Sequence, residues 1–119
     1  MTTPKSIIKS AFTGFTVGGA AIPVKYLRYE GHDEPYIVYT ETDNADVLRA
    51  DDEVENYITY YDFDIYSKSN HTPIQAAVIE LLEENGFTRC PERDSPDMYE
   101  PDTGFYHKTL CFYIERSVN

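Results

Sequence analysis

The chain has 119 residues, of which 21 are Asp or Glu and ten are Lys or Arg, so its formal net charge is −11. This length suffices for one domain with its own core, and nothing in the sequence indicates a second domain. The field of so acidic a protein opposes adhesion to phosphate backbones and to anionic membrane surfaces, so neither sequence-specific nucleic-acid binding nor membrane association is expected. Without the pattern of a signal peptide or transmembrane helix, the sequence predicts a soluble protein of a reducing compartment.

The N-terminal region favours a short helix. Thr3 and Pro4 supply its start, and apolar residues recur along one side until Thr13-Gly14. These apolar residues are Ile7, Ile8, Ala11 and Phe12. The segment that follows, Gly18 to Ala21, predicts a flexible connection.

Two strands and an acidic segment are expected next. Val24 to Tyr29 predicts a strand, Glu30 to Pro35 a turn, and Tyr36 to Glu41 the hairpin partner of that strand. The segment Thr42 to Glu55 is rich in carboxylates, and charge of this kind usually lies on a solvated surface. We therefore expect this segment to be a connecting loop.

The clearest strand pattern runs from Tyr57 to Tyr66. Its residues alternate between two faces, the period of a strand that is buried on one side. One face carries Tyr57, Thr59, Tyr61, Phe63 and Ile65. The other face carries Ile58, Tyr60, Asp62, Asp64 and Tyr66.

A second helix follows a polar turn at Ser67 to His71. Thr72 offers an N-cap hydroxyl, Pro73 fits the first helical position, and Gln75 can cap reciprocally. Apolar residues then recur at helical spacing until Asn85-Gly86 ends the helix. These residues are Ile74, Ala77, Val78, Leu81 and Leu82.

The C-terminal region completes the sheet. Phe87 to Cys90 predicts the start of a strand, Pro91 to Gly104 a long loop, and Thr109 to Arg116 a closing strand. The expected fold class is α+β, an antiparallel or mixed sheet of about four to five strands with two helices packed on it. The expected order is α-β-β-β-α-β-β.

No metal-binding or disulfide pattern is present in the sequence. Cys90 and Cys111 are too few and too far apart to specify a zinc site, and we expect free thiols. The three histidines, His32, His71 and His107, fall in separate expected loops, where exposure is the simplest interpretation. No cofactor is predicted.

Asp62 and Asp64 form the one pair of residues whose spacing suits cation binding or acid–base catalysis. Two residues apart on a strand, they share a face and could hold a divalent cation or act as an acid and a base. Solvated carboxylates on the polar face are the more economical interpretation. The sequence also lacks a glycine-rich phosphate loop and a serine nucleophile elbow, so no enzymatic activity is expected.

The chain has eleven tyrosines and no tryptophan. Strand propensity explains about half of these tyrosines. A tyrosine combines a large apolar ring with a polar tip, so the excess favours an interaction surface.

Three phrases of the sequence carry a resemblance to a known family. They are A-I-P-V-K-Y-L-R-Y-E at residues 21–30, Y-Y-D-F-D-I-Y-S-K-S at residues 60–69, and E-E-N-G-F at the end of the second expected helix. Together with the short first helix, they resemble small tail-assembly proteins of long-tailed bacteriophages and prophages. The chain is most similar to the tail terminator, or tail-to-head joining, group.

The resemblance implies a structural role in the virion. It suggests an α+β protein, made in the bacterial cytoplasm, that forms a hexameric ring at the head-proximal end of the tail tube. Its implied partners are further copies of itself, the tail tube protein and the head-tail connector protein. An acidic surface facing the lumen of such a ring would repel the DNA that passes through it.

Two expected loops are candidates for contacts with neighbouring proteins, because long loops in a small domain usually have a use. They span Asp46 to Glu55 and Pro91 to Gly104. The candidate interface or lumen-facing residues are Asp46, Asp51, Asp52, Glu53, Glu55, Asp94, Asp97 and Tyr99.

Other functions remain open at this point. The chain could be another small head completion or minor tail protein, which would dock elsewhere in the particle. It could also be an acidic monomeric binding module that inhibits a DNA-binding enzyme, a function that a surface of clustered single-sign charge would favour. An enzyme is the most remote alternative, and it would require Asp62 and Asp64 to line a closed pocket.

Overall fold

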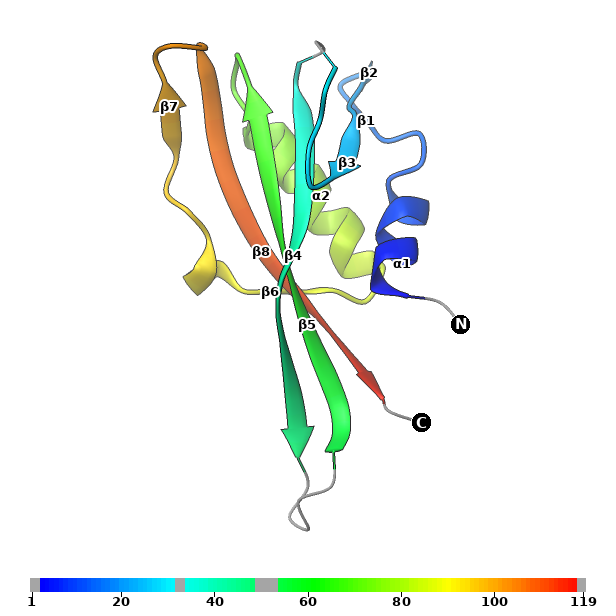
Figure 1. Cartoon of the computed structure of the whole chain (residues 1–119). Coiled ribbons are helices and arrows are strands. Elements are labelled where there is room, and N and C mark those ends of the chain that lie inside the picture. The colour runs from blue at the N-terminus through cyan, green and yellow to red at the C-terminus, as the bar shows by residue number, and fades with distance from the viewer. Residues whose placement is uncertain (1–2, 32–33, 49–53, 118–119) are drawn as a thin grey trace.

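A six-stranded mixed sheet carries two helices on one of its faces, which confirms the expected α+β class (Figure 1). The computed structural model describes residues 3–31, 34–48 and 54–117. A separate two-stranded sheet brings the strand count to eight, more than expected. The elements are α1 (Pro4–Ala11), β1 (Thr16–Val17), β2 (Ala20–Ala21), β3 (Val24–Tyr26), β4 (Tyr36–Leu48), β5 (Val54–Ser67), α2 (Thr72–Glu84), β6 (Thr88–Arg89), the 3-10 turn η1 (Pro91–Arg93), β7 (Met98–Glu100) and β8 (Phe105–Ser117).

The main sheet has the strand order β3-β4-β5-β8-β6, and β7 also pairs with β8. All pairs are antiparallel except β3 with β4, which are parallel from Val24 opposite Ile37 to Tyr26 opposite Tyr39. The expected hairpin between these two strands is therefore wrong. Leu27 adopts a left-handed φ of 70° directly after β3, and the chain then returns to start β4 beside the beginning of β3.

The first helix matches its sequence signals closely. The Thr3 hydroxyl accepts a hydrogen bond from the Ser6 N–H, and the Ser6 hydroxyl accepts one from the Thr3 N–H, which makes a capping box. The connection expected to be flexible at residues 18–21 instead belongs to the small β1–β2 hairpin. Gly18 and Gly19 have φ values of 60° and 83°, the positive values that a tight two-residue hairpin turn requires at both positions.

The second helix begins one residue before the position expected from its cap. Thr72 is the first helical residue and His71 occupies the N-cap without a side-chain cap bond. The Asn70 side chain accepts the hydrogen bond from the Thr72 N–H at 3.0 Å, so asparagine supplies the cap interaction expected of threonine. The helix ends before Asn85, and Gly86 follows with φ of 91°, which confirms the predicted stop.

The core lies between the two helices and the sheet face that they cover. Phe63 is fully buried at its centre, with its ring centroid 6.0 Å from Phe12, 5.5 Å from Tyr39 and 5.7 Å from Phe112. The predicted alternation along the central strand is confirmed, because its core-facing residues are buried. Tyr57 is the exception, with 46% of its surface exposed.

The expectation of an acidic loop at residues 42–55 is wrong for the residues of this segment that the structure describes. Residues 42–48 belong to β4 and residues 54–55 to β5, and the two strands pair as far as Leu48 opposite Val54. Pairing overrides the low strand propensity of residues such as Asp43 and Asn44. Residues 49–53 lie outside the described part of the chain.

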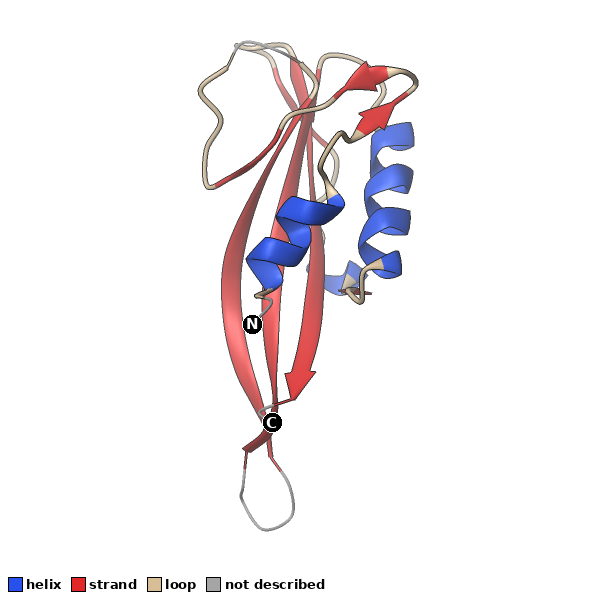
Figure 2. Ribbon diagram, turned by 90° about the vertical axis from the view of Figure 1, so that its right-hand side faces the viewer, coloured by secondary structure: helices blue, strands red, loops and turns tan. Residues whose placement is uncertain are grey.

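These strands form a projection that we call the arm, defined as residues 41–48 of β4 and 54–58 of β5. The last residues of β8 pair with β5 along the arm, from Ile58 opposite Glu115 to Asn56 opposite Ser117. The helices cover only the other half of the sheet, which we call the body, and the arm extends away from it (Figures 1 and 2). The molecule measures 52 × 27 × 24 Å as a result.

The expected long loop at residues 91–104 is likewise structured. It contains η1 and β7, and it follows the outer edge of β8, which starts at Phe105 and not at Thr109. Ser95 forms two hydrogen bonds with Thr109 of β8. Its N–H donates to the Thr109 carbonyl, and its hydroxyl accepts from the Thr109 N–H. This segment therefore closes one edge of the main sheet.

Candidate functional site

The sequence segment that spans the arm, residues 41–55, is the most acidic part of the chain. Residues 41–55 contain one base, Arg49, and seven acids, namely Glu41, Asp43, Asp46, Asp51, Asp52, Glu53 and Glu55. Residues 41–45 are exposed. Among the described residues, β3 pairs with β4 only as far as Tyr39, so the outer edge of β4 is unpaired along the arm. An uncovered strand edge of this length can pair with another chain.

Two of the candidate interface residues, Asp46 and Glu55, fall on the arm. Asp46 lies in β4 opposite Tyr57, and Glu55 lies in β5. Asp51, Asp52 and Glu53 lie outside the described residues. The structure therefore places Asp46 and Glu55 in two neighbouring strands, and not in a loop on the body.

Asp94 has a structural role within the chain. Its two carboxylate oxygens lie 2.9 Å from the two terminal guanidinium nitrogens of Arg89, and one of them also accepts a hydrogen bond from the Cys111 N–H at 2.8 Å. The two charged side chains are only 22% and 11% exposed. This bidentate ion pair fixes the segment after η1 against β8.

Asp97 and Tyr99 lie together at the β7–β8 end of the body. The Asp97 side chain is 71% exposed and lies 3.6 Å from the Lys108 ammonium. The Tyr99 ring is 53% exposed and packs 4.9 Å from the ring of Tyr106, which is itself 43% exposed. Met98 beside them is 37% exposed, so this edge carries an apolar surface with an acidic neighbour.

A ladder of aromatic rings crosses the sheet face opposite the helices. Tyr36 of β4 stacks on Tyr66 of β5 at 4.8 Å, and Tyr66 stacks on His107 of β8 at 4.2 Å. Tyr29 extends the ladder, with its ring 4.8 Å from Tyr36. All four rings are half-buried. Burial and the charge of Asp64 raise the pKa of Tyr66 to about 12, so its hydroxyl stays neutral at physiological pH.

The expectation of exposed loop histidines is wrong at two positions. His107 lies on β8 within the ladder, and its Nε2 atom is 3.4 Å from an Asp64 carboxylate oxygen. His71 is 7% exposed and contacts Gln75 through its Nδ1 atom. His32 lies outside the described residues.

Asp62 and Asp64 share the ladder face but are not freely solvated, which corrects the expectation for this pair. The Asp64 side chain is 25% exposed and accepts a hydrogen bond from the Thr109 hydroxyl at 2.5 Å. Burial, and next the charge of Asp64, raise the pKa of Asp62. Neither aspartate is among the residues that line the described pockets.

Cys90 and Cys111 are buried free thiols, as the sequence predicted. Burial raises the pKa of Cys90, and burial together with the neighbouring Cys90 raises that of Cys111 to about 12. Both groups are therefore held as thiols. Within the described residues, no cluster of three or more His, Cys, Asp or Glu side chains could hold a metal ion. The helices in the same residues are all too short or too polar to cross a membrane.

Sequence reasoning missed one feature of the body, a basic corner beside α1 and β3. The first 29 residues contain Lys5, Lys9, Lys25 and Arg28 and no acid, so they carry a charge of +4. The remaining 90 residues contain six bases and 21 acids and carry a charge of −15, which together with +4 gives −11. This asymmetry between the two parts of the chain was the available signal.

The chain was compared with protein families and with curated proteins. No protein-family model matches the chain, and a search of curated proteins finds no match.

Proposed function

We propose that this chain is a structural protein of phage morphogenesis that caps the tail tube at its head-proximal end and helps join the tail to the head. It acts as a hexameric ring and contacts the tail tube protein and the head-tail connector protein. The three phrases that resemble tail terminators fall on the framework of the body, since they cover β3, the body half of β5 and the end of α2. The proposal requires no cofactor and no catalytic step.

The observation that carries the proposal is the arm. A strand pair that extends beyond the helices adds little buried surface to the core of a monomeric domain. Tyr57 on the arm, for example, is 46% exposed. The unpaired outer edge of β4 adds backbone donors and acceptors that another chain can satisfy. Such an element supports assembly with neighbouring subunits or with a tube.

The acidic residues between positions 46 and 55 have a second use within a ring. Asp46, Asp51, Asp52, Glu53 and Glu55 either contact a neighbouring protein or face the lumen, where their charge repels passing DNA. Asp97 and Tyr99, on the opposite end of the body, supply a second contact surface. Asp94 supports that surface from within, through its ion pair with Arg89.

The distribution of charge disfavours the inhibitor alternative. Exposed acids occur on the arm, as Glu41 and Asp43, and separately on α2, as Glu80, Glu83 and Glu84. Basic residues occupy a third region beside α1. A mimic of nucleic acid needs one continuous surface of negative charge, whereas these carboxylates are divided among several surfaces.

Electron microscopy of particles from the source phage or induced prophage tests the proposal directly. The particles are labelled with an antibody to this chain, and we expect label at the head-proximal end of the tail. Label at another position would assign the chain to a different completion or minor tail role. Abundant tailed particles with accessible ends and no label would contradict a virion function.

Substitution tests the acidic segment separately. Replacement of Asp51, Asp52 and Glu53 with serine is expected to lower tail joining and infectivity, because it removes three charges from the acidic segment between β4 and β5. The matched control replaces Glu80, Glu83 and Glu84 with serine, which removes the same charge from α2. Unchanged joining in the first variant would remove this segment from the mechanism.

A further inference from the structure

A surface pocket of about 480 Å³ lies between the turn before α2, the residue before β7 and the start of β8. We call it the α2–β8 pocket. It is lined by Lys68, Ser69, Asn70, His71, Thr72, Asp97 and Tyr106. All of these residues except His71 are exposed, so the pocket is open to solvent and its polar side chains are within reach of a ligand.

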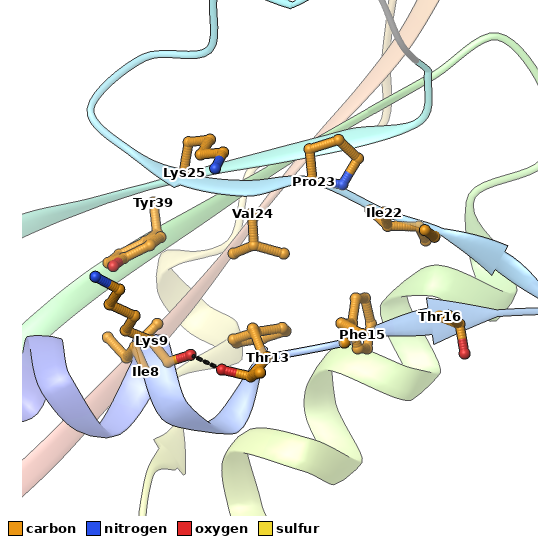
Figure 3. A pocket seen from close by; sticks show the side chains of 13 residues that line it. Ile8, Lys9, Thr13, Phe15, Thr16, Ile22, Pro23, Val24, Lys25 and Tyr39 are labelled. Atoms are coloured by element: carbon orange, nitrogen blue, oxygen red, sulfur yellow. Dashed lines mark hydrogen bonds between the residues drawn. The ribbon is translucent and has the colours of Figure 1, made fainter.

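A depression of the same volume beside α1 has a different lining (Figure 3). Its lining includes Ile8, Phe12, Ile22 and Tyr39, which are core residues with at most 7% of their surface exposed. The apolar surface of these four side chains is already used within the chain. The α2–β8 pocket, in contrast, offers polar groups and an aromatic ring that are exposed, so it is the stronger candidate for a ligand site.

His71 forms the buried side of the α2–β8 pocket. Its side chain is 9% exposed, and the Gln75 amide N–H donates a hydrogen bond to its Nδ1 atom. The neutral ring therefore carries its proton on Nε2. This atom lies 4.0 Å from an Asp97 carboxylate oxygen, which is too far for a hydrogen bond, and it donates to no other described residue. A buried donor and a carboxylate are thus separated by a gap.

The gap between His71 and Asp97 suits a hydroxyl group. A hydroxyl oxygen placed there accepts from the Nε2–H and donates to the carboxylate, at ordinary distances of about 2.8 Å. An ionised phosphate or carboxylate could accept from His71, but it cannot donate to Asp97, and the charge of Asp97 would repel it. The net charge of −11 adds to this repulsion. A neutral ligand with hydroxyl groups is therefore favoured.

The exposed rim of the pocket supplies further hydrogen-bonding groups. The Asn70 amide oxygen accepts from the Thr72 N–H at 3.0 Å, which leaves the Asn70 amide N–H groups as donors for a ligand. Lys68 adds an ammonium group and Thr72 a hydroxyl. A ligand with several hydroxyls can engage this rim at the same time as His71 and Asp97.

Tyr106 provides an aromatic wall. Its side chain is 43% exposed, and its ring centroid lies 4.9 Å from that of Tyr99 and 6.4 Å from that of His71. An exposed aromatic ring beside polar groups suits a ligand that has an apolar face and a polar edge. A pyranose ring has this form, because its C–H groups lie on its faces and its hydroxyls around its edge.

We propose that the α2–β8 pocket binds a sugar residue, with the Tyr106 ring against its apolar face and one hydroxyl between His71 and Asp97. The site goes beyond the proposed structural role and does not depend on it, because all of its residues come from one copy of the chain. The open pocket predicts weak binding, with a Kd in the millimolar range. A free sugar and a sugar in a glycan chain offer the same chemistry, and the test separates them.

An NMR titration of the ¹⁵N-labelled protein tests the site. Glucose, galactose, mannose and N-acetylglucosamine, and the methyl glycosides of all four, are each added to about 100 mM, which reveals millimolar binding. We expect at least one sugar to cause saturable shifts in the amide signals of residues 68–72 and 106, while residues 8–15 beside α1 stay unchanged. Equal binding of the methyl glycoside indicates a sugar in a glycan chain, whereas binding of the reducing sugar alone indicates a free sugar.

Substitutions at exposed positions link the shifts to the pocket. Tyr106→Ala should weaken binding at least about tenfold, because it removes the aromatic wall, whereas Tyr106→Phe keeps the ring and should stay within about twofold. Asp97→Ala should also weaken binding about tenfold, because the sugar hydroxyl loses its acceptor. The matched control is Tyr57→Ala, which removes a tyrosine of similar exposure, 46%, from the arm and should leave the affinity unchanged.

Several results would overturn the site. They are the absence of shifts with every sugar, shifts that occur away from the pocket, and wild-type affinity in both Tyr106→Ala and Asp97→Ala. Inorganic phosphate is titrated in parallel, and shifts at residues 68–72 with phosphate alone would show an anion site in place of a sugar site. The role in head-tail joining is decided by the microscopy alone, so either proposal can fail while the other stands.

Discussion

The body and the arm belong to the same sheet but differ in how far their side chains are buried. In the body, Phe63 and Ile65 of β5 are fully buried beneath α1 and α2. On the arm, the same strand continues with Tyr57 at 46% exposure, and the residues of β4 from Glu41 to Ala45 are exposed. The backbone pairing is continuous, whereas the burial stops where the helices end.

This difference separates the region that stabilises the fold from the region that is available for binding other molecules. Burial of apolar surface is the main driving force for folding, so the body accounts for most of the stability. The arm keeps its strand pairing but adds little buried apolar area. Mutations should therefore divide into those that unfold the protein and those that change only what it binds.

The largest expected effect comes from Phe63→Ala. This substitution removes a buried ring that packs near the rings of Phe12 at the C-cap of α1, Tyr39 and Phe112. It should lower the free energy of unfolding by about 3–5 kcal/mol. Chemical denaturation with urea, followed by circular dichroism, measures the loss.

Tyr57→Ala on the arm is the matched comparison for the same strand. Because Tyr57 is 46% exposed, we expect a loss below about 1 kcal/mol. If the two losses were similar, the arm would contribute to stability as the body does, and the division between the two regions would be wrong.

The second prediction concerns the ion pair that closes the edge of the body. Asp94→Ala leaves the Arg89 guanidinium and the Cys111 N–H without their shared acceptor, and it should cost about 2 kcal/mol. The control is Asp97→Ala, which removes an exposed carboxylate a few residues away and should cost less than about 0.5 kcal/mol. Equal losses in thermal or urea unfolding would mean that the Arg89 pair does not hold this segment.

The third prediction concerns the junction of the body and the arm. The buried Tyr61 ring belongs to the body, and its hydroxyl donates to the Glu41 carboxylate at 3.0 Å, where the arm begins. Tyr61→Phe should cost about 1 kcal/mol. Hydrogen exchange should also quicken in peptides of the arm more than in peptides of α2.

Tyr113→Phe is the control for this junction. It removes a tyrosine hydroxyl from the same sheet without taking away a hydrogen bond to another described residue. Exchange in the arm should stay at the wild-type rate in this variant. Equal changes in the two variants would show that the Tyr61 hydroxyl does not anchor the arm.

The body could be predicted from the sequence because apolar periodicity encodes burial. The alternation from Thr59 to Ile65 and the helical stripe of Ile74, Val78 and Leu82 match the buried residues. Periodicity carries no such signal on the arm, where both faces meet water. There the charge suggested a loop, whereas cross-strand pairing makes strands.

Contacts between residues that are not adjacent in the sequence also explain which features of the candidate sites could not be predicted. The sequence placed Asp94 in a free loop, because its ion pair depends on where Arg89 sits in the folded chain. It placed His107 in a loop, because the start of β8 is set by pairing with β7. The excess of tyrosine suggested an interaction surface, which stays a prediction, whereas the ladder of Tyr36 and Tyr66 is visible only in the structure.

The smallest expected effect concerns Asp62, a body residue on the uncovered face of the sheet. Its pKa is raised above the ordinary value of 3.8 in the folded protein, first by burial and next by the charge of Asp64. A raised folded pKa means that folding favours the protonated form, so the stabilising contribution is present below pH 3.8 and is lost as pH rises through the folded pKa. Asp62→Asn, which cannot ionise, should therefore be more stable than wild type at pH 7.

This gain should depend on pH and on Asp64. Because Asp62 is partly exposed, solvent screening keeps the gain below about 1 kcal/mol, and it should shrink as both proteins are taken to about pH 3. In an Asp64→Asn background the gain at pH 7 should also be smaller, because one cause of the raised pKa is gone. A gain that is the same at both pH values would mean that the amide acts through a new hydrogen bond, and that ionisation of Asp62 does not oppose folding of the body.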